Sequence, residues 1–202
     1  MSEAVRHGIG VVGYPGAGKS TAARLLAERA NAVRVETGWL VRNGACEHFC
    51  CGEDDLSSEQ LGEYSTMRRD TDGGDYVARE VIDTLDGADE FPDRPAVVCG
   101  IRDSEALDAL REYFDRFEIV WVHTPFDVRL ERLTGRARDG EDGFDRETLA
   151  ERDAREAMWG LPELTFHANH KIRNDDTVRT LDVRLGSVAK TSRLITEYVV
   201  AQ

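Results

Sequence analysis

The chain has 202 residues, a formal net charge of −13 and 41% hydrophobic residues. This length allows one α/β domain with a sizeable core, with or without a small insertion. No apolar run is long enough to span a membrane, and the acidic surplus argues against a protein that binds nucleic acid regardless of sequence. The first residues lack the apolar region of a signal peptide, so we expect a cytoplasmic protein.

Lysine is scarce among the 26 basic residues: only Lys19, Lys171 and Lys190 are lysines, and the rest are arginines. Scarce lysine with a strongly negative charge is typical of adaptation to high salt, where screening makes a large net charge tolerable. A genome rich in G and C, which favours arginine codons, is the alternative explanation. The composition therefore favours a halophilic source.

Residues 13–20 carry the most specific motif, Gly-Tyr-Pro-Gly-Ala-Gly-Lys-Ser. They match the pattern G-x-x-x-x-G-K-[ST], in which backbone N–H groups surround the phosphates of a nucleotide. Residues 7–12 are apolar and β-branched, which predicts a buried strand, and residues 19–30 predict a helix. This context favours a true phosphate loop over a glycine-rich turn with a chance lysine.

The motif also predicts which residues contact the ligand. Lys19 is expected to reach the outer phosphates of ATP as a catalytic residue, and the Ser20 hydroxyl is expected to hold Mg²⁺. The predicted ATP-binding residues of this segment are Gly13, Pro15, Gly16, Ala17, Gly18, Lys19, Ser20 and Thr21.

The rest of the chain alternates between strands and helices. Short apolar runs predict strands at residues 33–36, 95–100, 118–123 and 170–173. Spacing and capping signals predict helices at residues 39–50, 57–67, 76–85, 104–114, 125–133, 146–159 and 178–188. This order predicts an α/β fold of the P-loop NTPase type, a three-layer sandwich whose parallel five-stranded sheet has helices on both faces.

The segment at residues 46–51 contains three of the four cysteines, Cys46, Cys50 and Cys51. Cys46 and Cys50 are four residues apart, so they can share one face of a helix as free thiols. A metal site is the alternative, although the paired C-x₂-C spacing of such sites is missing.

Arginines gather on both sides of a polar segment at residues 139–143. Arg129, Arg132, Arg136 and Arg138 precede it, and Arg152 and Arg155 follow it. Arginine pairs beside a mobile loop suit a lid that closes on phosphates, where Arg132 would contact ATP and Arg136, Arg152 and Arg155 would act in catalysis. Surface ion pairs with Glu131, Glu151 and Glu156 are the alternative.

Residues 35–42, Val-Glu-Thr-Gly-Trp-Leu-Val-Arg, resemble the acceptor-side segment of adenylate kinases. The resemblance implies that Thr37, Gly38 and Arg42 bind the phosphate acceptor. Gly100-Ile101-Arg102 is similar to the segment that supplies such kinases with a phosphate-gripping arginine, which implies a catalytic and acceptor-binding role for Arg102. Residues 132–136 are similar to the entry of their lid.

A broader resemblance covers residues 8–177 and includes VVCGIRDSEALDAL, HTPFDVRLERL and AERDARE. These segments resemble an archaeal group of P-loop kinase-like proteins related to dephospho-CoA kinase and adenylate kinase, and the composition favours a haloarchaeal member. The resemblance implies a single domain over residues 1–202, with an acceptor-side insertion at about 37–90 and a lid at about 136–146.

Two positions depart from these kinases. Cys99 stands where an aspartate usually organises Mg²⁺, and a thiol is a poor ligand for that hard cation. Trp39 stands where an acidic residue usually follows Thr-Gly. Glu36 and Asp103 are the nearest candidates for compensation. Trp39 could stack on an acceptor base or pack into the core.

These features predict an ATP- and Mg²⁺-dependent kinase that transfers the γ-phosphate to a nucleoside monophosphate or nucleotide-like acceptor. The missing acidic residues at Cys99 and Trp39 motivate the alternative of a nucleotide-dependent switch, or slow ATPase, that acts on a protein partner. Processing of nucleic acid ends is disfavoured by the net charge. The acceptor is therefore expected to be a small molecule, without a nucleic acid or membrane partner.

Overall fold

The computed structural model describes residues 5–135 and 145–192. At its centre lies a sheet of five strands in the order β2-β3-β1-β4-β5. The strands are β1 (His7–Val12), β2 (Val33–Glu36), β3 (Ala96–Cys99), β4 (Arg116–His123) and β5 (His170–Arg173). Neighbouring strands are all parallel, so each connection crosses the sheet and brings helices onto its faces.

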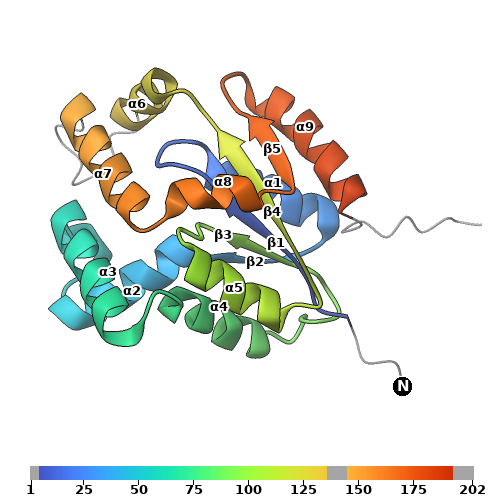
Figure 1. Cartoon of the computed structure of the whole chain (residues 1–202), viewed down its shortest axis with the longest axis horizontal. Coiled ribbons are helices and arrows are strands. Elements are labelled where there is room, and N and C mark those ends of the chain that lie inside the picture. Colours follow the sequence, from blue (N-terminus) through green and yellow to red (C-terminus); the bar gives the residue numbers. More distant parts are fainter. Residues whose placement is uncertain (1–4, 136–144, 193–202) are drawn as a thin grey trace, which may run out of the picture.

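Helices cover both faces of the sheet (Figure 1). Those of the described residues are α1 (Lys19–Ala30), α2 (Thr37–Phe49), η1 (Glu53–Asp55), α3 (Ser58–Asp72), α4 (Tyr76–Asp86), α5 (Ser104–Tyr113), α6 (Phe126–Thr134), α7 (Arg146–Met158), η2 (Leu161–Glu163), α8 (Leu164–His167) and α9 (Val178–Thr191). Helices α1 and α9 bury Leu26 and Leu185 against one face, and α4 and α5 bury Leu85 and Leu107 against the other. The predicted three-layer α/β sandwich is confirmed.

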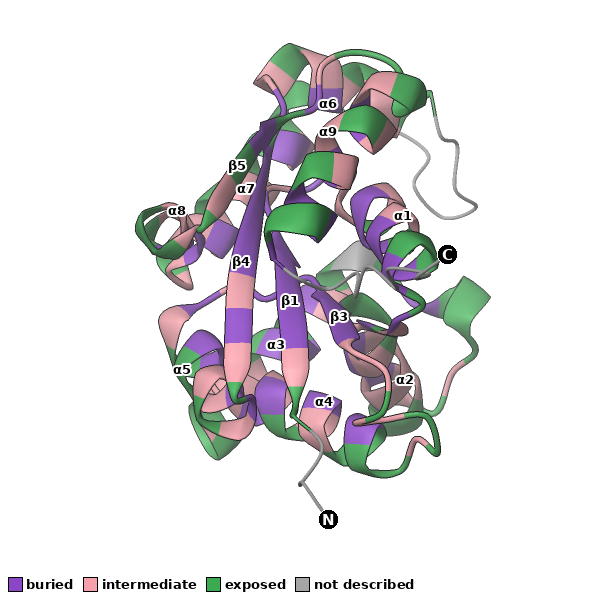
Figure 2. Cartoon of the chain, turned by 90° about the vertical axis from the view of Figure 1, so that its right-hand side faces the viewer, coloured by how far each residue is buried: buried purple, intermediate pink, exposed green. Residues whose placement is uncertain are grey.

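The central strands β1, β3 and β4 are buried along most of their length (Figure 2). A strand that is covered on both faces needs a continuous apolar run, which is the pattern that predicted these strands. The predicted strand at residues 118–123 begins two residues earlier, at Arg116. The short segments η1, η2 and α8 were not predicted, because three or four residues show no helical periodicity.

Helix α3 begins with the predicted capping box. The Gln60 backbone N–H donates to Ser57 Oγ at 3.1 Å, and the Ser57 backbone N–H donates to Gln60 Oε1 at 3.0 Å. These bonds satisfy N–H groups that the first turn of a helix leaves without partners. They fix the start of the helix that faces α2 in the segment between β2 and β3.

Helices α2, η1, α3 and α4 all lie between β2 and β3, the segment predicted as an acceptor-side insertion. A third apolar cluster, which includes Val41, Ala45 and Tyr64, joins α2 to α3. Residues 136–144 of the predicted lid lie outside the described residues, so the division into domain, insertion and lid stays a prediction. Within the described ranges, no helix is long and apolar enough to cross a bilayer.

We expect Leu185→Ala to lower the free energy of unfolding by about 2–5 kcal/mol, because it leaves a cavity between α9 and the sheet. Leu185 is 0% exposed. Val183→Ala on the same helix is the matched control, since Val183 is 66% exposed and should cost less than about 0.5 kcal/mol. Urea unfolding measures both. Equal losses in the two variants would contradict the described packing of α9.

Candidate functional site

The loop between β1 and α1 adopts a backbone that requires glycine. Gly18 has φ +90°, a conformation in which other residues are strained, and a Cβ there would lie 2.3 Å from Asn174 Nδ2. A Cβ on Gly13 would lie 2.5 Å from the carbonyl oxygen of Val122. The motif glycines are therefore dictated by the close approach of strands and loops behind the phosphate loop.

The carbonyl groups of this loop point into the protein and are held there by side chains. The Ala17 carbonyl accepts hydrogen bonds from Thr124 Oγ1 at 3.0 Å and from Asn174 Nδ2 at 2.8 Å. Both donors are buried. Helix α1 begins at Lys19, and its N-cap residue Gly18 provides no side-chain cap. The N–H groups of its first turn are therefore available to an anion, which the helix dipole also favours.

Arg129 braces the loop from α6. Its Nη1 donates to the Pro15 carbonyl at 3.0 Å, and its guanidinium makes a two-point ion pair with Asp153 of α7 at 2.8 and 2.6 Å. The guanidinium also lies 5.2 Å from the centre of the Tyr14 ring. Arg129 is thus buried and occupied by the protein, so it holds the loop in place and does not face a ligand.

Lys19 lies half-buried at the start of α1, and its Nζ donates to the Tyr14 carbonyl at 3.0 Å. Loss of water around the ammonium lowers the pKa of Lys19, while the Glu156 carboxylate raises it; Arg102 and Arg152 lower it further. Positive charge is therefore concentrated where an anionic ligand would relieve the repulsion.

The Ser20 hydroxyl donates a hydrogen bond of 3.1 Å to Glu36 Oε2, at the end of β2. Cys99 Sγ lies farther away, at 4.0 Å from Ser20 Oγ. Burial raises the pKa of Cys99 to about 12, and the nearby Glu36 charge adds to this effect. The thiol is therefore neutral near pH 7, and the carboxylate beside Ser20 comes from β2.

The loop opens into a cleft of about 400 Å³ at the carboxyl ends of the strands. Of the residues predicted to bind or act, those that line this cleft are Pro15, Gly16, Gly18, Lys19, Ser20, Thr21, Thr37, Gly38, Arg42, Arg102 and Arg152. Such crevices are where parallel α/β sheets bind ligands. The loop side and the acceptor side predicted from sequence therefore share one cleft.

The remaining predicted residues lie elsewhere. Ala17 is a buried residue of the loop itself, and Gly13 packs against the end of β4. Arg132 approaches the loop, with Nη1 3.8 Å from the position of a Cβ on Gly18. Arg155 lines a separate groove with α3, and Arg136 lies outside the described residues.

On the acceptor side, residues that are close in the sequence have different environments: Thr37 is buried, whereas Trp39 is exposed. Thr37 is buried, and its Oγ1 donates to the Gly100 carbonyl at 3.0 Å. Trp39 is 56% exposed and lines the cleft with Arg42. Core packing is therefore the wrong interpretation of Trp39.

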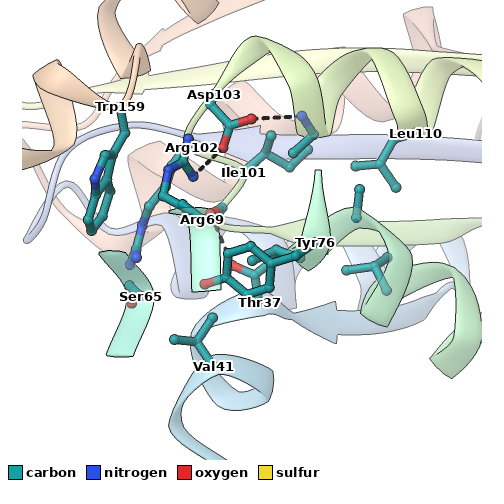
Figure 3. A pocket seen from close by; sticks show the side chains of 15 residues that line it. Thr37, Val41, Ser65, Arg69, Tyr76, Ile101, Arg102, Asp103, Leu110 and Trp159 are labelled. Atoms are coloured by element: carbon teal, nitrogen blue, oxygen red, sulfur yellow. Dashed lines mark hydrogen bonds and ion pairs between the residues drawn. The ribbon is translucent and has the colours of Figure 1, made fainter. Parts of the chain in front are cut away.

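A small apolar pocket of about 20 Å³ adjoins the cleft and shares Thr37, Gly100 and Arg102 with it (Figure 3). The Trp159 ring faces two arginines, with its centre 5.3 Å from the Arg69 guanidinium and 5.8 Å from that of Arg102. Sequence reasoning missed Trp159 and Arg69, because they come from helix ends and faces that no motif marks. The pocket extends the acceptor side of the cleft.

Two acidic residues near the cleft have different surroundings. Asp103 caps α5, accepting from the Ala106 backbone N–H at 2.7 Å, and pairs with Arg69 at 2.7 Å, so it is fully engaged away from Ser20. Glu156 of α7 is buried 3.5 Å from Arg102 Nε. Its Oε2 and Arg102 Nε lack hydrogen-bond partners. Asp103 therefore does not compensate for Cys99.

The cysteine segment shows no metal centre. Cys46, Cys50 and Cys51 are free thiols at the end of α2. In the part of the chain that the structure describes, no group of three or more His, Cys, Asp or Glu side chains could hold a metal ion. The prediction of free thiols fits these residues, although Cys50 follows the last residue of α2 and so does not share a helix face with Cys46.

We expect Gly18→Ala to lower the free energy of unfolding by about 2 kcal/mol, because it combines a left-handed alanine with displacement of Asn174. Gly87→Ala is the control: Gly87 has φ −84°, and a Cβ there meets nothing closer than 3.5 Å. That control should change stability by less than about 0.5 kcal/mol. Thermal and urea unfolding measure both variants, and an unchanged Gly18→Ala would contradict the loop geometry.

Comparisons with known proteins agree with this geometry. A family model described as an AAA domain matches residues 9–156. A UPF0200 protein from Methanothrix thermoacetophila is 35% identical over 172 residues, which cover 84% of this chain and 89% of that protein.

Two solved structures share the fold. Shikimate kinase from Bacteroides thetaiotaomicron has a TM-score of 0.62 at 13% identity, with 93% of this chain and 98% of that chain covered. A gluconokinase from Sinorhizobium meliloti has a TM-score of 0.52 at 18% identity, with 94% and 97% covered. At such low identities these likenesses show a P-loop kinase-like fold and nothing further. Together with the archaeal relative, the motif and the sheet order, they lead to one conclusion: the chain belongs to the UPF0200 family of AAA-domain, P-loop kinase-like proteins.

Proposed function

We propose that this protein is an ATP- and Mg²⁺-dependent kinase that phosphorylates a nucleoside monophosphate or nucleotide-like acceptor. The observation that carries the proposal is the shared cleft: the phosphate loop, with Lys19 and Ser20, opens into the same space as Arg42 and Arg102. Phosphoryl transfer depends on holding donor and acceptor in line within one charged, sheltered site. The two kinases of similar fold are named for small-molecule substrates, gluconate and shikimate, which supports a small-molecule acceptor here.

The residues present fit a nucleotide with its magnesium ion. The loop admits no side chain at Gly18, and its uncapped helix offers backbone N–H groups to phosphate oxygens. The Ser20 hydroxyl lies beside a carboxylate, which matches the oxygen ligands that Mg²⁺ prefers. When bound, the ion would neutralise charge on the transferred phosphoryl group.

The chain's own cations would act on the phosphates. Lys19 would leave the Tyr14 carbonyl for the outer phosphates, and Arg102 and Arg152 line the cleft between loop and acceptor side. The acceptor oxygen would form a bond to the γ-phosphorus of ATP, while the bond between that phosphorus and the bridging oxygen breaks and ADP leaves. Arginine suits this role because its planar donors match phosphate oxygens in pairs. The Arg102–Glu156 contact, at 3.5 Å, is loose enough to yield to a phosphate.

The acceptor side supports a ligand that has both a ring and an anionic group. Trp39 exposes more than half of its surface in the cleft, which is costly for a large aromatic side chain and suits stacking on a base. Arg42 lies three residues later on the same helical face and would bind a phosphate. This combination favours a nucleotide-like acceptor over a simple polyol.

We expect Lys19→Ala to lower kcat/KM by about a hundredfold, because it removes a charge that stabilises the transition state. The assay is a panel of nucleoside monophosphates and nucleotide-like acceptors with ATP and Mg²⁺ at high salt concentration. Lys190→Ala, an exposed lysine of α9, is the control for loss of one positive charge and should keep wild-type rates.

Normal ATP binding without phosphorylation of any acceptor would refute the kinase proposal. A partner protein captured in the ATP state and released in the ADP state would then support the alternative of a nucleotide-dependent switch. Equal capture in both states would exclude that alternative as well.

We expect Trp39→Ala and Arg42→Ala each to raise KM for the acceptor by about tenfold while ATP binding stays unchanged, because both residues line the cleft from α2, the proposed acceptor side. Arg24→Ala is the control, since Arg24 is exposed on α1 and pairs with Glu28 at 2.7 Å. Steady-state kinetics with each substrate varied in turn separates the two effects. An equal loss of ATP affinity would place these residues at the donor instead.

A further inference from the structure

A magnesium ion beside Ser20 would need a carboxylate ligand, and the end of β3 does not provide one. The β3 strand ends in Cys99, whose thiol is buried and 4.0 Å from Ser20 Oγ. Sulfur is a soft ligand, whereas Mg²⁺ prefers hard, charged oxygen. Any acidic group that serves a metal here must therefore come from another strand.

The sheet order brings such a group to the same place. Strands β2 and β3 are parallel neighbours, and Glu36 pairs with Cys99 in their register. Paired residues on adjacent strands lie about 5 Å apart. An acidic side chain at the end of either strand can therefore reach the same point. Glu36 does reach it: its Oε2 accepts the Ser20 hydroxyl at 3.1 Å.

The carboxylate of Glu36 is only partly used by the protein. Its Oε1 is buried with no hydrogen-bond partner, and Arg34 Nη1 lies 3.7 Å from it. A buried carboxylate oxygen without a partner is costly, and a bound cation would remove the cost. Of the other candidates, Asp103 caps α5 and pairs with Arg69, and Glu156 lies on α7, 3.5 Å from Arg102 Nε. Glu36 is the carboxylate that accepts the Ser20 hydroxyl.

We propose that Glu36 supplies the carboxylate that holds Mg²⁺ beside Ser20, in place of an acidic residue at the end of β3. This inference rests on the proposed ATP and Mg²⁺ site, but it does not depend on which acceptor is phosphorylated. It assigns the metal-binding charge to β2, so the site is complete despite Cys99.

The test compares ATP affinity with Mg²⁺ and with EDTA by titration calorimetry. In Glu36→Gln, the ratio of the two affinities should fall by about tenfold or more, because the metal loses a charged partner. In EDTA the same variant should bind ATP as tightly as the wild type or more tightly, since a negative charge beside the triphosphate is gone. Glu28→Gln is the matched control: it makes the same change of charge on the exposed face of α1 and should leave the ratio unchanged.

A second variant separates the metal role from a structural one. Adding Cys99→Asp to Glu36→Gln should restore much of the Mg²⁺ effect, because it returns a carboxylate to the neighbouring strand end. A Glu36→Gln variant with an unchanged ratio, or with equal losses in Mg²⁺ and EDTA, would overturn the inference. Thermal unfolding in EDTA confirms that each variant is folded, and Glu36→Asp, which keeps the charge, should retain part of the ratio.

The same titrations distinguish this inference from the wider proposal. If the wild type binds ATP with a Mg²⁺ effect that Glu36→Gln removes, Glu36 holds the metal even when no acceptor is phosphorylated, and only the kinase proposal fails. If acceptors are phosphorylated while Glu36→Gln keeps the wild-type ratio, the kinase proposal stands and the role of Glu36 is wrong. No Mg²⁺ effect in the wild type would overturn both.

Discussion

The carbonyl of Ala17 is the point on which the site depends. Thr124 and Asn174, from the segments that follow β4 and β5, both donate to it, so two separate parts of the chain hold one peptide group. With this carbonyl fixed inward, the N–H of Gly18 in the same peptide group points the opposite way, and the uncapped first turn of α1 adds its own N–H groups. The carbonyl and the N–H of one peptide group point in opposite directions. Anchoring the carbonyl inward therefore leaves the N–H available to an anion.

The cleft is a place of balanced charge in a strongly acidic protein. Lys19, Arg42, Arg102 and Arg152 bring positive charge to it, and the carboxylates that line it are those of Glu36, Glu53 and Glu156. Without that balance, cations this close together would repel one another in poorly screened surroundings. The protein as a whole carries a net charge of −13, so this group of cations stands out in an acidic chain and would attract an anionic ligand.

The fold and the phosphate loop could be predicted because their signals are local. Apolar runs located the five strands, and the loop motif fixed the start of α1. The acceptor side was harder: Arg42 and Trp39 were noticed, but Trp159 and Arg69 reach the site only through packing between α3, α5 and α7. Arg129 belongs to the arginine cluster noted in the sequence, yet burial and Asp153 commit it to the protein. Sequence spacing shows which residues share a helix face, but not which partner that face meets.

Asp153 lies between Arg152 and Glu156 on α7, and this position has a consequence for how the helix is aligned. A shift of α7 by one residue would move Asp153 by about 1.5 Å and turn it by about 100°, which would break its two-point contact with Arg129. Arg129 also donates to the Pro15 carbonyl, so the position of α7 is fixed directly relative to the phosphate loop. The alignment of Arg152 and Glu156 with the phosphate loop is therefore set by a direct contact between α6, α7 and the loop, and not by the chain connection alone.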